Sequence, residues 1–474
     1  MPQTTALPDW RPARVHQALE RDFFDPVEGA DFPQRVLRYR NQRWAERMGL
    51  GGLADVQWLD HFGRFAPLPG SFETPLALRY HGHQFQSYNP QLGDGRGFLF
   101  AQGFDLKDGS LRDFGSKGSG VTPWSRGGDG RLTLKGGVRE VLAAEMLEAL
   151  GVETSKGFSL IETGESLYRN DEPSPTRAAV LVRLSHSHIR IGTFQRLGFF
   201  KDEANLQKLA EHVIAHYYPH LGDLPQEERV PALLGAVAGN VARVGAQWIA
   251  AGFVHGVLNS DNINITGESF DYGPWRFLPR YDPGFTAAYF DETGLYAFGR
   301  QPDALAWNLT RLAETLVPLA SVEKLEPELN RFWPAFQNEL ARAVLRRLGL
   351  KTRGEDKDGQ LVSAFYGFMA AAAPDYERVF FDWRGGVLAH DKAMAGPLGA
   401  LYRGDDFAPV LSLLETFEPC ENARAHPYFE GPAPRTMLID EVEAIWAPIA
   451  AKDDWSGFLS ALDDIAAMRA AYAV

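Results

Sequence analysis

Hydrophobic positions follow one spacing in the first two hundred residues of the chain and another in the rest. Short apolar stretches broken by glycine and proline, such as those between residues 157 and 200, predict strands and turns. Later segments carry apolar residues at three- and four-residue steps, which predicts helices. The ranges with this helical spacing are 202–219, 231–251, 304–317, 325–348, 360–373 and 440–472. We therefore expect an α+β chain whose C-terminal region is large and helical.

Two earlier segments also show a helical pattern. Residues 33–47 do so within an N-terminal stretch, up to about residue 75, that is rich in proline, phenylalanine and arginine. We interpret this stretch as an extension packed on the first lobe. The second segment has a single apolar face, formed by Val138, Val141, Leu142, Met146, Ala149 and Leu150. Its spacing predicts a helix inside the first lobe.

The composition is that of a globular protein large enough for two lobes. The chain has 474 residues, of which 45% are hydrophobic, so it can bury at least one large core. Its formal net charge of −13 argues against electrostatic binding of nucleic acid or of an anionic membrane. Any phosphate site must therefore be basic only locally.

Cysteine usage and hydropathy indicate the compartment. The single cysteine, Cys420, excludes an internal disulfide and a cysteine zinc cluster. No run of about 18 apolar residues occurs, and the first ten residues have neither a charged nor an apolar signal region. We expect a cytoplasmic protein that binds neither nucleic acid nor membrane.

Two glycine-rich segments are candidates for binding phosphate. Gly93, Asp94, Gly95 and Arg96 form the first, and Gly128-Asp129-Gly130-Arg131 repeats the pattern. Glycines let backbone N–H groups approach an anion, and arginine offers a fork for phosphate oxygens. A Gly-Asp-Gly turn is equally often a simple hairpin. The spacing fits neither the Walker A motif nor the dinucleotide fingerprint.

Lys117 and Glu140 have the arrangement of a kinase ion pair. Lys117 closes a predicted strand and stands among glycines, and Glu140 follows about twenty residues later on the predicted helix. In protein kinases such a glutamate orients the lysine toward nucleotide phosphates. The helical neighbours of Glu140 are apolar, so its carboxylate need not face water. The alternatives are a solvated lysine in a flexible loop and a surface glutamate beside Arg139.

The segment 255–274 carries the candidate metal chemistry. Asn262 and Asp271 offer an amide carbonyl and a carboxylate, which suit Mg²⁺ when waters and substrate phosphates supply its other ligands. The alternating pattern of residues 262–265 predicts a short strand between them. In loops of the aminoglycoside-kinase type an aspartate takes the proton of the acceptor hydroxyl, but Val257 stands in that place. Asp261 is the nearest carboxylate that could replace it.

Two further pairs of residues allow two interpretations each. Arg183 and Arg190 lie seven residues apart, and arginines that converge on a cleft suggest anion binding, whereas structural salt bridges are the competing explanation. His81 and His83 could begin a metal site. Because no third ligand follows at short spacing, hydrogen-bonded turn histidines are the favoured interpretation.

Taken in order, these motifs resemble the selenoprotein O family, also called the YdiU family. The resemblance spans residues 80 to about 290. It rests on Gly-His-Gln-Phe at 82–85, Pro-Gln-Leu-Gly-Asp-Gly-Arg at 90–96, Lys-Gly-Ser-Gly-x-Thr-Pro at 117–123, Asp-Gly-Arg at 129–131, Arg-Glu at 139–140, Ser-His-Ile-Arg-x-Gly-Thr-Phe at 187–194, His-Gly-Val-Leu-Asn-x-Asp-Asn at 255–262 and Asp-Tyr-Gly-Pro at 271–274. It implies a pseudokinase fold that binds ATP in an inverted orientation and transfers AMP to protein hydroxyls with Mg²⁺ or Mn²⁺.

The same resemblance implies a role for each candidate residue. Lys117 and Glu140 would form the ion pair, Asp261 would accept the proton, and Asn262 and Asp271 would hold the metal ion. The residues implied to contact nucleotide are Gly93, Gly95, Arg96, Lys117, Asp129, Gly130, Arg183, Arg190 and Asp271. The chain lacks the cysteine or selenocysteine that relatives carry near the C-terminus. Redox control through a terminal disulfide is therefore not expected.

We thus expect a protein-kinase-like two-lobed fold that transfers AMP from ATP to Ser, Thr or Tyr side chains of proteins. The expected divisions are an N-terminal extension at 1–75, a nucleotide-binding lobe at 76–200 and a helical catalytic and metal-binding region at 201–474. A γ-phosphoryl transferase and a nucleotide-binding scaffold without turnover are the alternatives. Val257 disfavours the first, and the intact pair of Asn262 and Asp271 disfavours the second. The sequence does not name the protein targets, the preferred metal ion or the oligomeric state.

Overall fold

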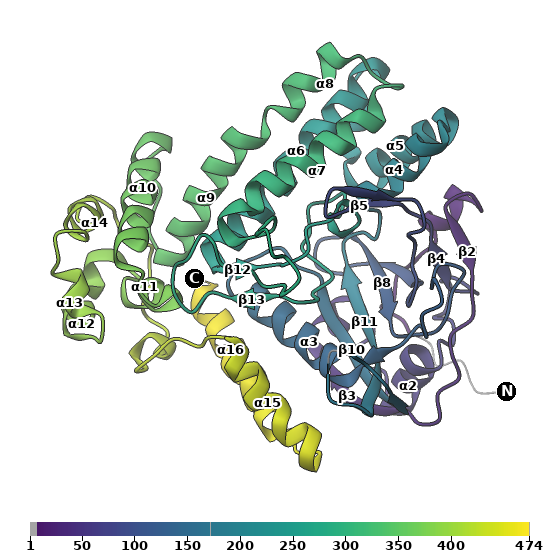
Figure 1. Cartoon of the computed structure of the whole chain (residues 1–474), viewed down its shortest axis with the longest axis horizontal. Helices are drawn as coiled ribbons and strands as arrows, with labels where there is room; N and C mark the ends of the chain where they lie inside the picture. The colour runs from purple at the N-terminus through teal and green to yellow at the C-terminus, as the bar shows by residue number, and fades with distance from the viewer. Residues whose placement is uncertain (1–6, 171, 474) are drawn as a thin grey trace.

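Nine antiparallel strands form one sheet, which makes up most of the first lobe (Figure 1). The computed structural model describes residues 7–170 and 172–473. The strand order is β2-β4-β7-β8-β11-β10-β3, with β1 beside β7 and β9 beside β11. The strands are β1 Pro12–Ala13, β2 Phe24–Pro26, β3 Val36–Arg40, β4 Leu76–Leu78, β7 Leu99–Phe104, β8 Leu111–Lys117, β9 Leu132–Thr133, β10 Lys156–Leu167 and β11 Thr176–Ser185. Because β7, β8 and β11 are buried along nearly their whole length, the centre of the sheet belongs to the core.

The first 75 residues contribute strands to this sheet. Strands β1, β2 and β3 pair with β7, β4 and β10, respectively. The helix predicted over residues 33–47 is therefore wrong in its first half, where Tyr39 of β3 lies opposite Leu160 of β10. Only the second half is helical, as α1 (Gln42–Arg47). A distant strand supplies the hydrogen bonds of β3, and a local pattern cannot show this.

The strands predicted between residues 157 and 200 are present as β10 and β11, but the end of that range is not a strand. Residues Ile191–Phe200 form helix α4, which packs on α7 (Gln301–Leu316) of the second lobe. Tertiary packing of a short apolar segment decides between helix and strand where periodicity alone is ambiguous.

Helix α3 (Leu134–Ala149) is buried on nearly all sides. The side-chain oxygen of Thr133 caps it by accepting a hydrogen bond from the backbone N–H of Gly136. The apolar face that the sequence predicts packs against β10 and β11. The helix is thus fixed to the sheet along its length.

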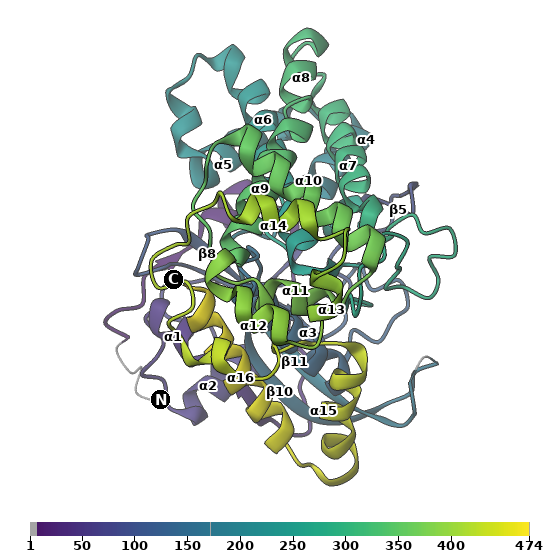
Figure 2. The ribbon, with the colours of Figure 1, turned by 90° about the vertical axis from the view of Figure 1, so that its left-hand side faces the viewer.

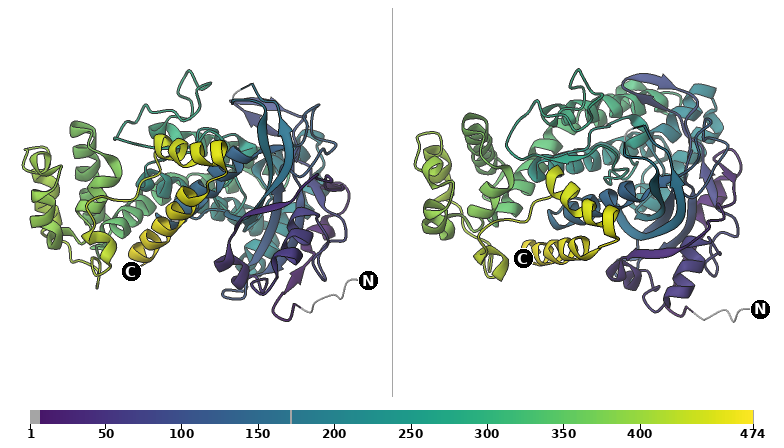
Figure 3. Two further views of the ribbon diagram at one scale, coloured as in Figure 1. Left: turned by 90° about the horizontal axis from the view of Figure 1, so that it is seen from below. Right: turned by 60° about the horizontal axis from the view of Figure 1, so that its bottom comes forward.

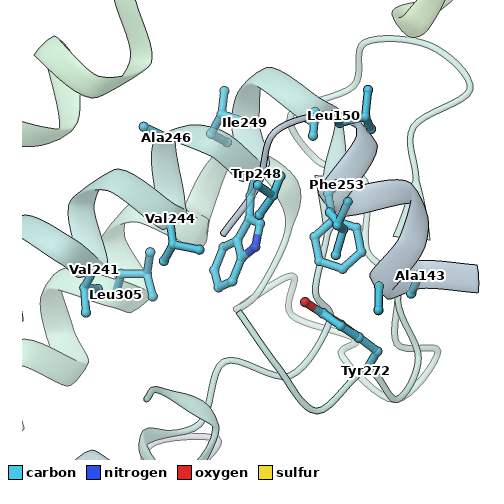
Figure 4. Close-up of a cluster of buried hydrophobic side chains, with 14 of the residues drawn as sticks. Ala143, Leu150, Val241, Val244, Ala246, Trp248, Ile249, Phe253, Tyr272 and Leu305 are labelled. Carbon is cyan, nitrogen blue, oxygen red and sulfur yellow. The ribbon is translucent and has the colours of Figure 1, made fainter. Parts of the chain in front are cut away.

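The second lobe is built around helix α6 (Gln226–Ala251), which ends at Gly252 in a left-handed conformation (Figure 2). Figure 4 shows Trp248 of α6 close to Phe253 and Tyr272, with Ala143 of α3 on the other side. These side chains belong to one continuous apolar cluster. The core therefore runs from one lobe into the other, and α3 lies between them.

Two predicted helices of the C-terminal region are each interrupted. Residues 325–348 belong to α8 (Val322–Leu329) and α9 (Phe332–Leu348), and residues 440–472 to α15 (Ile439–Lys452) and α16 (Ser456–Tyr472). Asp453, between the last two, has a φ of 55°, which reverses the chain. The remaining helices are α2 Asp55–Gly63, α5 Glu203–Tyr217, α10 Glu355–Ala372, α11 Tyr376–Asp382, α12 His390–Ala395, α13 Gly399–Tyr402 and α14 Ala408–Leu414.

Helices α15 and α16 return to the first lobe and pack on α3 (Figure 3). Arg469 of α16 forms ion pairs with Glu145 and Glu148 of α3, and Lys135 of α3 pairs with Glu443 of α15 at 2.8 Å. The α+β, kinase-like architecture expected from the sequence is confirmed. Within residues 7–170 and 172–473, no helix combines the length and the apolar character needed to span a lipid bilayer.

Candidate active site

A cavity of about 640 Å³ lies between the two lobes and is lined from both of them. The sheet lobe contributes the two glycine-rich segments and Lys117, and the second lobe contributes residues 257–271. The predicted site residues that line this cavity are Gly93, Gly95, Arg96, Lys117, Asp129, Gly130, Arg183, Arg190, Asp261, Asn262 and Asp271. Glu140 lines an adjoining cavity behind Lys117. The structure thus brings all twelve predicted residues to one region.

Lys117, Glu140, Arg183 and Asp271 form a charge cluster in which the first three residues are buried and Asp271 is partly exposed. The ammonium of Lys117 lies 2.7 Å from Glu140 and 2.9 Å from Asp271. The guanidinium of Arg183 lies 3.2 Å from Glu140 and 3.0 Å from Asp271. Burial alone would raise the pKa of Asp271, but Lys117 and Arg183 outweigh burial and hold this pKa well below its usual range. Asp271 is therefore an anion throughout the physiological pH range.

The predicted pairing of Lys117 with Glu140 follows from where their elements meet. Lys117 is the last residue of β8, opposite Leu181 of β11, and Glu140 lies on the face of α3 that looks toward β8. Both side chains are buried, so neither the solvated lysine nor the surface glutamate that the sequence left open is present. Arg183 makes salt bridges, as one of its two interpretations predicted, and it also lines the cavity, so anion binding by Arg183 stays a prediction.

The first glycine-rich segment is hydrogen-bonded to residues that precede the second segment in the chain. The hydroxyl of Thr122 donates to the backbone carbonyl of Asp94, and the hydroxyl of Ser125 donates to that of Gly95, each at 2.5 Å. A methyl group on Gly130 would lie 2.2 Å from the backbone of Gly120, and Gly130 has a φ of +67°. Only glycine fits there, so the second segment is held in one conformation.

Arg190 connects the first glycine-rich segment to the second lobe. Its guanidinium lies 3.2 Å from the carboxylate of Asp94 and donates to the backbone carbonyl of Asp261 at 3.1 Å. The guanidinium carbon also stands 4.3 Å from the centre of the Tyr80 ring. Neither Asp94 nor Tyr80 was singled out from the sequence. The position of Asp94 between two glycines was visible, but its burial was not.

Asp261 lies in a short 3₁₀ turn (Ser260–Asn262), and its side chain reaches the cavity. The residue is 7% exposed, and its Oδ1 has no hydrogen-bond partner among residues 7–170 and 172–473. Burial raises the pKa of Asp261 to about 7, although Arg190 acts in the opposite direction. A buried carboxylate that lines a cavity and has a raised pKa is suited to accept a proton from a bound molecule.

A hairpin of β5 (Gly82–Gln84) and β6 (Ser87–Asn89) covers the turn that carries Asp261. The backbone N–H of His83 donates to the hydroxyl of Ser260 at 2.7 Å, and that of Phe85 donates to Asn259 at 3.0 Å. This hairpin accounts for the burial of Asp261, and it was not predicted from the sequence. Its sequence signal is the run Gly-His-Gln-Phe at 82–85, to which no local spacing assigns a role.

Asn262 and Asp271 face the same cavity but are not joined by the predicted strand. Residues 262–265 make only one isolated bridge, between Asn264 and Arg190. The side-chain nitrogen of Asn262 donates to the carbonyl of Val257 at 3.0 Å, and its amide oxygen accepts no hydrogen bond from residues 7–170 and 172–473. Within the described parts of the chain, no three His, Cys, Asp or Glu side chains gather as a metal site. A metal ion bound here would take further ligands from a substrate or water.

His81 and His83 are hydrogen-bonded residues of the hairpin, as the favoured interpretation predicted. Nδ1 of His81 lies 2.8 Å from the hydroxyl of Tyr88, and Nδ1 of His83 lies 2.7 Å from the side-chain nitrogen of Gln195. Burial lowers the pKa of His81 to about 4. Both histidines therefore serve the fold of the hairpin.

Comparison with known proteins adds to this geometry. The model of the family described as "protein adenylyltransferase SelO" matches residues 10–466. A "protein nucleotidyltransferase YdiU" of Gloeobacter violaceus is 45% identical over 98% of this chain and 96% of its own length. Proteins of the same description from Synechocystis and Vibrio cholerae are 43% and 39% identical, over 93% and 77% of this chain and 95% and 73% of their own lengths. The chain belongs to the SelO family of protein adenylyltransferases.

Proposed function

We propose that this enzyme transfers AMP from ATP to Ser, Thr or Tyr hydroxyls of other proteins. The observation that carries the proposal is the position of Asp261. It is a buried carboxylate of a residue that lines the cavity, while the place of the usual kinase base is taken by Val257, whose carbonyl accepts a hydrogen bond from Asn262. The base therefore lies beside the metal-binding asparagine, and chemistry at the α-phosphate is favoured over transfer of the γ-phosphate.

The cations of the cavity would hold the triphosphate. Lys117, Arg183 and Arg190 stand deep in the cavity, and Arg96 lies at its mouth without an ion pair among the residues described. Backbone N–H groups of the glycine-rich segments suit phosphate oxygens because glycine permits close approach. The arginines would anchor the β- and γ-phosphates, which presents the α-phosphorus to the acceptor. Asp129 and Gly130 would contact the remainder of the nucleotide.

The transfer itself is a displacement at phosphorus. The acceptor oxygen forms a bond to the α-phosphorus, and the bond from that phosphorus to the bridging oxygen of the β-phosphate breaks. Pyrophosphate leaves with the electron pair, and the hydroxyl proton passes to the carboxylate of Asp261. Lys117, held by Glu140, stabilises the negative charge that develops on the leaving group.

Asn262 and Asp271 fit a Mg²⁺ or Mn²⁺ ion. The amide oxygen of Asn262 has no hydrogen-bond partner in the part of the chain that the structure describes, and Asp271 is ionised and reaches the same cavity. Oxygen ligands of this kind suit a hard divalent cation that also contacts phosphate. When bound, the ion would neutralise charge on the phosphates. Asp271 also keeps its contacts to Lys117 and Arg183, which fix the direction of its carboxylate.

The cellular setting follows the same proposal. A protein substrate and ATP suit a cytoplasmic enzyme, and we retain residues 1–75, 76–200 and 201–474 as the proposed divisions of the chain. The N-terminal division would act as part of the nucleotide-binding lobe, since its strands join the same sheet.

The position of the transferred label tests the proposal. The protein is incubated with Mg²⁺ or Mn²⁺, candidate acceptor proteins and ATP labelled at either the α- or the γ-phosphate. We expect label on protein only from the α position, with a gain in mass equal to AMP. Label from the γ position alone would instead show a kinase. Saturable ATP binding without label from either position would show a scaffold.

A further inference from the structure

A second cavity, of about 570 Å³, adjoins the nucleotide cavity. The two share Arg96, Lys117, Arg131 and Arg169 in their linings. From there the second cavity extends along α3, past residues 272–276 and 287–290, to Glu443 of α15. Of the residues that line the second cavity and not the first, Glu140 alone has a part in the proposed transfer.

The lining of this second cavity is strongly basic although the protein is acidic. Seven arginines and lysines face three carboxylates there. Four of the seven basic side chains have ion-pair partners, namely Lys117 with Glu140, Arg131 with Glu165, Lys135 with Glu443 and Arg169 with Asp129. The formal charge of the whole chain is −13, so carboxylates are not scarce in the protein. The excess of positive charge is therefore local to this cavity.

Arg139 and Arg276 form no ion pair with any carboxylate of residues 7–170 and 172–473. The Arg139 guanidinium stands 5.1 Å from the centre of the Trp275 ring and makes only long contacts, at 3.5 Å, to the carbonyls of Gly273 and Trp275. Arg276 donates to the carbonyls of Pro274 and Trp275. Burial, and then the neighbouring charge of Arg276, lower the pKa of Arg139 to about 10. A bound anion would reduce the repulsion between these two partly buried cations, so the site favours anion binding.

Exposed aromatic side chains connect this basic region to the nucleotide cavity. Tyr289 is 85% exposed and Phe290 is 47% exposed, and both line the second cavity. The Phe290 ring lies 5.8 Å from the ring of Phe85, whose neighbour Gln84 lines the nucleotide cavity. A ligand that contacts this aromatic pair therefore borders both cavities at once.

We propose that Arg139, Arg276, Tyr289 and Phe290, together called the acceptor groove, bind an acidic segment of the acceptor protein. Aspartate or glutamate side chains of that segment would contact the two arginines. Its backbone and apolar side chains would lie on the two aromatic rings, which places the acceptor hydroxyl at the nucleotide cavity. This inference rests on the proposed function and names its substrate class, a protein segment with carboxylates near the modified hydroxyl.

Other anions suit the acceptor groove less well. The phosphates of ATP already have Lys117, Arg183 and Arg190 in the first cavity. A nucleic acid would meet the net charge of −13 over the rest of the surface. Two exposed aromatic rings beside a guanidinium pair favour a mixed polar and apolar ligand such as a peptide.

The test compares matched acceptor peptides. Each pair of peptides carries the same Ser, Thr or Tyr acceptor, with flanking residues either Asp and Glu or Asn and Gln, and is labelled from α-labelled ATP. For the unmodified protein we expect kcat/KM to be roughly tenfold higher for the acidic peptides. In Arg139→Gln combined with Arg276→Gln we expect that ratio to fall to within about twofold of unity, with ATP affinity retained. Raising the salt concentration should lower the ratio in the unmodified protein.

Control variants separate recognition from folding. Arg342→Gln removes an exposed arginine of α9 and should leave the ratio unchanged. Arg139→Lys combined with Arg276→Lys keeps both charges and should retain most of the preference. Tyr289→Ala should lower kcat/KM for acidic and neutral peptides alike, because the ring supports the backbone.

Three outcomes would overturn the inference. They are equal kcat/KM for acidic and neutral peptides in the unmodified protein, an unchanged preference in the double glutamine variant, and no transfer to any peptide. The proposed function fails separately, if intact proteins receive no label from α-labelled ATP. Pyrophosphate bound in the acceptor groove in crystals of the unmodified protein, and absent from that groove in the double glutamine variant, would assign these arginines to the leaving group instead.

Discussion

A methyl group added to Gly82 would lie 2.9 Å from Oδ1 of Asp261. The same methyl group would lie 3.1 Å from Cβ of Asp261 and 3.2 Å from its backbone nitrogen. The absence of a side chain at Gly82 therefore lets the β5–β6 hairpin rest directly on the turn that carries the proposed base. A displacement of the hairpin would therefore also displace Asp261.

Gly82→Ala should consequently displace Asp261 and lower AMP transfer by roughly tenfold to a hundredfold, since small misplacements of a reacting group are costly. ATP affinity should fall by a smaller factor than the rate, because Arg190, which donates to the Asp261 carbonyl, is one of several proposed triphosphate contacts. Rates of labelling and the equilibrium binding of ATP measure the two effects. Gly222→Ala, where no atom lies within 4 Å of the added methyl group, is the matched control. Equal activity of the two variants would show that the hairpin does not position the base.

Asp261→Asn should lower the rate of transfer by about a hundredfold to ten-thousandfold, the range expected for loss of a general base. Folding should be retained, because Asn has nearly the same volume and Oδ1 of Asp261 has no partner to lose among the residues described. Single-turnover labelling and ATP binding are the measurements. Loss of ATP binding in parallel with activity would assign Asp261 to the nucleotide instead.

Glu140→Gln should lower activity strongly, because Lys117 keeps Asp271 as a partner at 2.9 Å but loses the group that orients it. Glu148→Gln should lower stability and leave activity largely unchanged. Glu148 contacts Arg43, Lys156 and Arg469 and is far from the cavity lining, so its loss costs about 1 to 3 kcal/mol of stability. Melting temperatures and labelling rates of both variants test the orienting role of Glu140 and the structural role of Glu148. If both variants lose activity equally at equal stability, the orienting role of Glu140 is wrong.

Asp271→Asn should abolish metal-dependent turnover and weaken the binding of Mn²⁺ in the presence of a nonhydrolysable ATP analogue. The carboxylate it replaces is the ionised ligand of the proposed pair. Titration calorimetry of Mn²⁺ into the protein with the analogue measures this directly. Unchanged Mn²⁺ affinity in a folded variant would remove Asp271 from the metal site.

The stability of the protein should fall in acid, starting near pH 6.5. Burial lowers the pKa of His16 to about 4 and that of His212 to about 2. The unfolded chain therefore takes up protons at higher pH than the folded protein does. The contribution is complete above pH 6.5 and is lost progressively as the pH falls toward 4 for His16 and toward 2 for His212.

His16→Leu should reduce this acid sensitivity by up to about 3 kcal/mol between pH 7 and pH 4. Both ring nitrogens of His16 lack hydrogen-bond partners among the residues described, so leucine breaks no polar contact. Urea unfolding at several pH values supplies the free energies. His390→Gln, a change at a half-exposed histidine, is the control. Parallel pH profiles of His16→Leu and the unmodified protein would exclude His16 as a source of the effect.

Features encoded within a few neighbouring residues were predictable from the sequence. The oxygen-donor side chains of Asn262 and Asp271, the departure at Val257 and the apolar face of α3 can be read without a fold. The kinase spacing of strand and helix also predicted the pairing of Lys117 with Glu140. A solvated lysine and a surface glutamate were the alternatives, and the structure shows the pair.

What the sequence could not show depends on chain segments that are distant from each other. Strand β3 pairs with the distant strand β10, and the buried Asp94 pairs with the distant Arg190. The cover over Asp261 needs two glycines, Gly82 and Gly192, that meet only in the folded protein. Tertiary contacts of this kind leave no periodic trace in the residues that make them.

The contact between α16 and α3 also concerns the order in which the protein is made. Arg469 is synthesised 324 residues after its partner Glu145. Until α16 has been made, the flank of α3 that it covers is exposed, and α3 is the helix that presents Glu140 to Lys117. We therefore expect a chain truncated before α16 to hold α3 less firmly and to have a lower rate of transfer.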